Sequence, residues 1–115
     1  ATTQSTIQFL LDQLSGLAHV QARKMFGEYA LYCDGKVVGL VCDDQLFVKI
    51  TPQGKALVGP HYLEGNPYPG AKPAMVIGAD EIENSERLCE LIRVTALALP
   101  APKPKPSKAR VRRGK

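Results

Sequence analysis

The first apolar repeat of the chain predicts an amphipathic helix over residues 6–17. Its apolar residues recur at steps of three and four, which places them on one stripe of a helix. The stripe consists of Ile7, Leu10, Leu11, Leu14 and Leu17. Thr2, Thr3 or Ser5 can cap the start of this helix, and Gly16 suits its end.

From Val20 onward the pattern changes to the period of two that is typical of strands. Segments 28–33 and 36–42 flank the pair Asp34-Gly35, which is a strong hairpin signal. A type I′ turn needs positive φ at both of its central residues, and this pair tolerates that conformation. The sequence therefore predicts an antiparallel hairpin at this point.

A second two-residue turn, at 43–44, leads into a strand over 45–50. With two residues in each turn, Leu31 lies opposite Val38. The same register predicts a cross-strand row of three large side chains on that face. This row consists of Tyr29, Leu40 and Phe47. Both faces of the meander carry apolar residues, so we expect one face to pack against helices and the other to meet a second subunit.

The remaining pattern predicts a short helix, a loop, a strand and a long helix. The pair Thr51-Pro52 is typical of a helix start. Segment 59–72 is rich in Gly and Pro and is predicted to be a loop, and 73–78 is predicted to be a strand. An amphipathic helix over 84–99 follows. The order predicts an α+β domain, in which helices flank an antiparallel sheet of three to four strands plus a later strand.

The charges divide the chain into two parts. Residues 1–102 hold eight Lys and Arg against eleven Asp and Glu, whereas residues 103–115 hold seven Lys and Arg and no acid. We therefore predict a domain over 1–100 and a disordered tail over 101–115, rich in Pro, Lys and Arg. The tail can neutralise phosphates without reading bases, because it has no aromatic residue; the alternative is a tail that only solubilises. Its cations are Lys103, Lys105, Lys108, Arg110, Arg112, Arg113 and Lys115.

Motifs of known catalytic chemistry are absent from the sequence, among them G-x-S-x-G, G-x-x-x-x-G-K-[ST] and H-E-x-x-H. One alternative remains open, a small ligand-binding or enzymatic domain that uses Lys49, Arg23 and His61 near the 59–72 loop. A lysine whose stem covers apolar surface while its amino group reaches water is the simpler interpretation of Lys49. We therefore expect no enzymatic activity, no bound metal and no cofactor.

The cysteines Cys33, Cys42 and Cys89 are too widely spaced to predict a disulfide framework or a zinc site. In the predicted register Cys42 lies across from Gly27 and not from Cys33, so all three are expected to be small apolar residues. No apolar run reaches the ~20 residues that a membrane helix needs, and the first residues contain no basic signal segment. We expect a cytoplasmic protein without a membrane partner.

The stretch from Arg23 to Lys49 resembles the N-terminal domain of the TfoX/Sxy family, which are bacterial regulators associated with natural competence. The positions that carry the resemblance are Arg23, Met25, Phe26, Gly27, Tyr29, Gly39, Leu40, Leu46 and Lys49, with the turn at 34–35. The later NPYPGAKPAMVI and the last helix are similar in placement. The resemblance implies an α+β fold similar to secretion-chaperone-like domains, often dimeric, with no cofactor. Full-length regulators add a helical C-terminal domain, where this chain has its basic tail.

Three functions follow from these patterns. The first is a non-enzymatic regulatory module that acts by dimerisation or by binding a transcription-regulator protein, with the tail adding non-specific affinity for DNA. The second is the small enzymatic or ligand-binding domain described above. The third is a chaperone-like dimer that holds a partner peptide on an exposed strand or groove. The motif glycines have structural roles in all three, because Gly27 and Gly39 let the backbone bend or pack closely.

Overall fold

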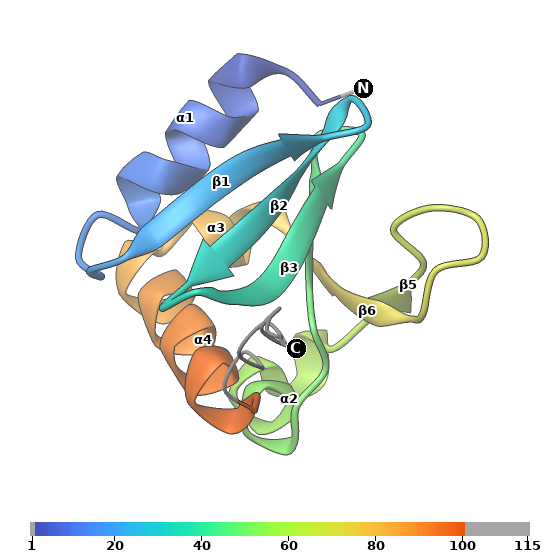
Figure 1. Cartoon of the computed structure of the whole chain (residues 1–115). Helices are drawn as coiled ribbons and strands as arrows, with labels where there is room; N and C mark the ends of the chain where they lie inside the picture. The colour runs from blue at the N-terminus through green and yellow to red at the C-terminus, as the bar shows by residue number, and fades with distance from the viewer. Residues whose placement is uncertain (1, 101–115) are drawn as a thin grey trace, which may run out of the picture.

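The computed structural model describes residues 2–100, which form a six-stranded antiparallel sheet with helices against one of its faces (Figure 1). The strand order is β1-β2-β3-β4-β6-β5. In chain order the elements are α1 (Gln4–Gln13), β1 (Val20–Met25), β2 (Glu28–Cys33), β3 (Lys36–Cys42), β4 (Gln45–Val48), α2 (Pro52–Val58), the 3-10 helix η1 (Gly59–His61), β5 (Glu64–Gly65), β6 (Ala74–Ile77), α3 (Ala79–Glu83) and α4 (Ser85–Ala98). The predicted α+β class is confirmed. The predicted tail, with its seven cations, lies outside the described residues.

Helix α1 starts and ends earlier than predicted. Thr3 is its cap, and the Thr3 hydroxyl accepts a hydrogen bond from the backbone N–H of Thr6 at 3.4 Å. Gly16 lies in the turn that follows the helix and does not end it. The apolar period continued past the helix because Leu14 and Leu17 still pack against the core from the turn.

The predicted loop over 59–72 is wrong in part, because it contains η1 and the short strand β5. β5 pairs with β6, where Gly65 lies opposite Ala74. Helix α3 was also missed. A two-residue strand and a five-residue helix are too short to show a period, so only their packing in the tertiary structure defines them.

A β-bulge changes the register predicted for β2 and β3. The pairing shifts between Leu31 and Tyr32, so Leu31 lies opposite Gly39 and not opposite Val38. The bulge lets both Val38 and Val41 face the main core, although a step of three positions would place them on opposite faces of a regular strand. An extra residue in one strand moves every side chain beyond it to the opposite face of the sheet. The predicted pairing of β2 with β3 is therefore wrong at every position beyond the bulge.

The predicted cross-strand row is wrong in one member for the same reason. Ala30, and not Tyr29, lies opposite Leu40, and Leu40 lies opposite Phe47 as predicted. Tyr29 packs instead against the core on the helix side of the sheet. The row on the other face therefore begins with a small residue.

The two faces of the sheet are covered to different degrees. One face packs against α1, α2 and α4 and holds the main core, which confirms that one face packs against helices (Figure 1). Its most deeply buried side chains include Leu14, Leu31, Leu46, Met75, Ile77, Leu88 and Ile92. The other face holds a small cluster of apolar residues, to which no helix within residues 2–100 contributes. That cluster consists of Cys42, Phe47 and Ala74, with Leu40 and Val76 against it.

Cys33 and Cys42 are both free and buried, and they lie on opposite faces of the sheet. Burial raises the pKa of both thiols above the ordinary value for cysteine. Two such thiols are poor nucleophiles, which agrees with the role of small apolar residues. Cys89 is partly buried, and its thiol donates to the backbone oxygen of Gln13 at 3.4 Å.

The start of the chain is tied to the turn between β3 and β4. The Thr2 hydroxyl donates to Glu28 Oε1 at 2.5 Å, and the backbone N–H of Thr3 donates to Asp44 Oδ1 at 2.8 Å. These bonds favour the ionised carboxylates. The Thr2 hydroxyl is the main reason that the pKa of Glu28 lies below its ordinary value, and the Thr3 amide is the main reason for Asp44.

The double variant Glu28→Gln, Asp44→Asn is expected to unfold more easily than the wild type at pH 7. A carboxyl with a lowered folded-state pKa stabilises fully above its unfolded value of ~4, and loses that contribution as the pH falls through the folded value. The difference in the free energy of unfolding should therefore shrink below about pH 4. Urea unfolding at pH 7, 4 and 3 measures it, and a difference that stays constant with pH would contradict the assignment.

Gly39→Ala is expected to destabilise the fold by about 3 kcal/mol, because small-to-large changes in a packed interior force the backbone apart. A Cβ on Gly39 would lie 2.3 Å from the backbone oxygen of Phe47, across the β3–β4 pair. Gly78→Ala is the matched control, since its Cβ meets nothing within 4 Å and its φ is −78°. Urea unfolding of the two variants compares them. Equal stabilities would show that β3 and β4 do not need the glycine.

Candidate functional site

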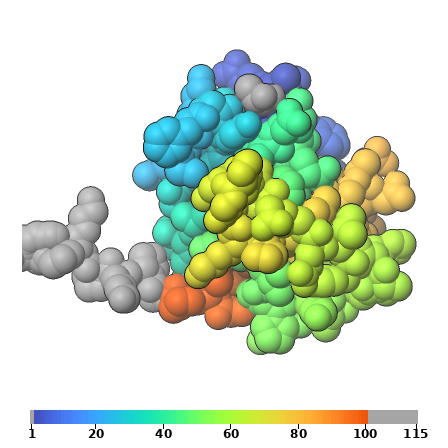
Figure 2. Space-filling model, turned by 90° about the vertical axis from the view of Figure 1, so that its right-hand side faces the viewer, coloured from blue at the N-terminus to red at the C-terminus, as the bar shows by residue number. Residues whose placement is uncertain are grey.

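Two adjoining grooves lie on the face of the sheet that no described helix covers. One is lined by β3, β4, Leu99 just after α4 and the loop 66–73, and the other by the β1–β2 hairpin tip, β2, β3 and the same loop. Leu40, Pro67 and Tyr68 line both, so they form one continuous surface. In Figure 2 the yellow loop stands over the green sheet, between the cyan hairpin and the orange end of α4. We call this surface the open-face groove.

The loop 66–73 forms one wall of the open-face groove and holds its own shape. The Asn66 side-chain amide donates to the backbone oxygen of Ala71 at 2.7 Å, and the Ala71 N–H donates to the oxygen of Tyr68 at 3.0 Å. Gly70 has a φ of +87°, which only glycine adopts at low cost. The loop therefore presents the Tyr68 ring, which is 52% exposed, from a wall with internal hydrogen bonds.

Phe26 forms the opposite end of the groove, at the tip of the β1–β2 hairpin. Phe26 and Gly27 have φ of +53° and +82°, as the two central residues of a type I′ turn require. This confirms that Gly27 lets the backbone bend. The left-handed conformation costs a residue other than glycine about 1–2 kcal/mol. Because the Phe26 side chain is 99% exposed, no burial in the described fold offsets that cost.

Large exposed apolar side chains concentrate at this groove. Seven such residues occur among residues 2–100, and four of them line it. The four are Met25, Phe26, Ile50 and Tyr68. Single exposed apolar residues are ordinary on protein surfaces, whereas a group of them around one concave surface marks a place where another molecule binds.

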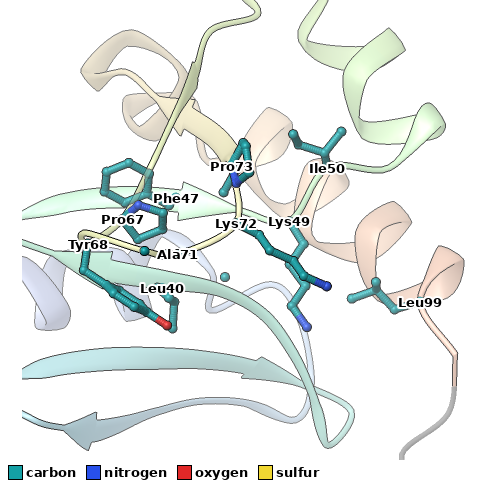
Figure 3. A pocket seen from close by; sticks show the side chains of 13 residues that line it. Leu40, Phe47, Lys49, Ile50, Pro67, Tyr68, Ala71, Lys72, Pro73 and Leu99 are labelled. Atoms are coloured by element: carbon teal, nitrogen blue, oxygen red, sulfur yellow. The ribbon is translucent and has the colours of Figure 1, made fainter.

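Lys49 and Lys72 lie at one end of the open-face groove, where Figure 3 shows both amino groups pointing the same way. The backbone N–H of Lys49 donates to the oxygen of Val38 at 2.8 Å, so the residue continues the line of β4 just past its end. Both side chains are exposed. Lys49 therefore has the predicted geometry of a strand-end lysine with its amino group in water.

The structure does not bring together the residues of the alternative catalytic site. Lys49 lines the open-face groove, whereas Arg23 lines a separate hollow, where its guanidinium lies 5.1 Å from the centroid of the Tyr32 ring. His61 is exposed on η1 and lines neither. Within residues 2–100 no group of three or more His, Cys, Asp or Glu could hold a metal ion. In the same part of the chain no helix is long and apolar enough to cross a membrane.

Most positions of the motif singled out in the sequence meet at the open-face groove. Six of the nine line it, namely Met25, Phe26, Gly39, Leu40 and Lys49, with Tyr29, whose side chain also packs against the main core, while Leu46 is buried in that core. Gly27 shapes the turn beside them, and Arg23 lies apart. The pattern missed Tyr68 and Lys72, which reach the groove from the loop. Both residues lie in the stretch NPYPGAKPAMVI, whose likeness in placement to the family was the signal for them in the sequence.

These features define a class of small α+β domain with a preformed apolar groove on the uncovered face of its sheet. The chain belongs to the TfoX N-terminal domain family, whose model matches residues 12–98. It is also similar to an uncharacterised 12.7 kDa protein in the trpE 5′ region of Spirochaeta aurantia, with 44% identity over 98 residues, which cover 85% of this chain and 84% of that protein. The resemblance seen in the sequence is confirmed, and membership supports a regulatory role at the level of the family.

Proposed function

We propose that the chain is a non-enzymatic regulatory module that acts by binding another protein through the open-face groove. The observation that carries this proposal is the exposure of Phe26 in a strained turn at the end of an apolar groove. Folding gains nothing from this ring. A partner that buries it would recover the cost of the turn.

The groove has the composition of a protein-binding surface. Phe26 and Tyr68 present two rings from different elements, and aromatic side chains dominate the energetics of many interfaces. Phe47, whose ring is largely buried, and Leu40 form the floor between them. A rigid apolar floor with exposed rings at its margin favours a protein segment over a small polar substrate.

The identity of the partner divides into two cases. A second copy of the chain would give the homodimer that was predicted, and a separate regulator of transcription would give a complex between different proteins. The chaperone-like function, in which a dimer holds a partner peptide on an exposed strand or groove, could use the same surface. We propose that the interaction takes place in the cytoplasm, and the three free cysteines support this, because thiols stay reduced there.

The double variant Phe26→Asn, Tyr68→Ser is expected to lose the partner and keep its fold. Asparagine tolerates the left-handed conformation, and neither ring is part of the main core, so the melting temperature should stay within a few degrees of the wild type. Immobilised wild type and variant are each exposed to a bacterial lysate, and the retained proteins are quantified. Sedimentation velocity of both shows whether the partner is a second copy.

Phe9→Gln is the matched control for that experiment. Phe9 is an exposed aromatic residue on α1, which packs on the other face of the sheet. Proteins that bind the open-face groove should be retained by Phe9→Gln and lost by the double variant. Identical retention by all three forms would contradict the proposal, and so would a dimer that both variants leave intact.

We further propose that the basic tail adds non-specific affinity for DNA, which the division of charge along the sequence supports. Replacing its seven Lys and Arg by Gln should abolish retention on a random duplex at low salt. If all seven contact phosphates, log K against log[salt] should have a slope of about −6 for the wild type. Fluorescence anisotropy across a salt series measures the slope. Equal binding by the Gln-substituted chain would leave the tail without this role.

A further inference from the structure

Most of the Lys and Arg side chains in the folded domain interact with other groups of the same domain. Five of the eight Lys and Arg in residues 1–102 interact with another group of the domain. Arg87 pairs with Glu81, Arg93 pairs with Glu90, Lys36 donates to the backbone oxygens of Ala96 and Leu99, Lys55 lies over the Tyr62 ring, and Arg23 lies over the Tyr32 ring. The remaining three, Lys24, Lys49 and Lys72, have no ion-pair partner in the described part of the chain.

Two of these three lysines share one end of the open-face groove. Lys49 and Lys72 both line it, and no Asp or Glu lines that part of it (Figure 3). The one acidic residue at the other end, Glu28, already accepts a hydrogen bond from Thr2. The two ammonium groups at one rim repel each other, and an anion bound between them would add two attractions that outweigh this repulsion. The groove is therefore apolar along its length and cationic at one end.

The sequence that follows Leu99 carries further positive charge. Leu99, which lines the groove beside the lysines, follows the last turn of α4, and Lys36 Nζ holds the backbone oxygens of Ala96 and Leu99 at 2.7 and 3.1 Å. The described part ends one residue later, and the sequence then holds seven cations and no acid over residues 103–115. The basic segment of this chain would be repelled by Lys49 and Lys72, so it is a poor occupant of the groove.

We propose that the open-face groove binds an apolar segment of a partner protein that carries Asp or Glu at one end. The apolar part of the segment lies between Phe26 and Tyr68, and its carboxylates lie at Lys49 and Lys72. This inference rests on the proposed function and adds the chemistry of the partner to it. A DNA duplex would satisfy the two lysines and offers its phosphate backbone, not apolar surface, to Met25 and Phe26, so a protein segment fits the whole groove better.

A random dodecapeptide library displayed on phage and selected on the full-length chain tests this chemistry. The selected peptides should combine aromatic or aliphatic residues with Asp or Glu clustered at one end. The most enriched peptide is then synthesised, and its Kd is measured by fluorescence anisotropy. Lys49→Gln, Lys72→Gln together should weaken binding at least tenfold, and added salt should weaken binding to the wild type alone.

Two controls make the assignment specific to the groove. Lys24→Gln removes the third unpaired lysine, which does not line the groove, and should leave Kd unchanged. A peptide with Asn and Gln in place of its acids should bind the wild type and the double lysine variant equally. The acidic and the neutral peptide, each measured against the wild type and the double lysine variant, give four Kd values. These form a double-mutant cycle that yields the coupling free energy between the peptide acids and the two lysines.

Each other outcome overturns the inference in a distinct way. Selected peptides that are apolar without acids, and that lose affinity in Phe26→Asn, Tyr68→Ser, would contradict the acidic partner and leave the proposed function standing. Peptide binding with the same Kd in both double variants as in the wild type would contradict both the acidic partner and the proposed function. Three further outcomes would also contradict an acidic segment as the occupant of the groove. They are a failure to enrich any peptide, competition by single-stranded DNA for the same lysines, and a homodimer that buries the groove.

Discussion

The packing of α4 against one face of the sheet is the contact on which the rest of this structure depends. Leu88, Leu91 and Ile92 are almost fully buried there, and α1 and α2 extend the same core. Side chains alternate between the faces of a strand, so a sheet with apolar residues on both faces and helices on one leaves apolar residues uncovered on the other. The open-face groove is the direct consequence of this one-sided packing.

The close approach of β3 and β4 adds a second constraint. Gly39 leaves room for the backbone of Phe47, and the bulge beside it turns both Val38 and Val41 toward the helices. The same arrangement keeps Leu40 and Phe47 on the uncovered face as the floor of the groove. One glycine and one irregular position therefore serve both the core and the candidate binding surface.

The groove combines parts with different structural origins. Its floor comes from regular strands, while Tyr68 and Lys72 come from a loop and Phe26 from a turn in a costly conformation. The regular strands owe their position to the core, and the loop and turn place side chains that the core does not need. Residues placed in this way are free to serve recognition, which agrees with the regulatory role of the TfoX N-terminal domain family.

The sequence by itself determined the elements whose signals are local. The cap at Thr51, the turn at 34–35 and the stripe of α4 depend on neighbours a few residues apart, so the pattern alone predicted them and the α+β class. Only the tertiary structure decided the bulge in β3, the short strand β5 and the meeting of Lys49 with Lys72. These depend on pairing and packing between segments far apart in the chain, and no local preference of the residues records them.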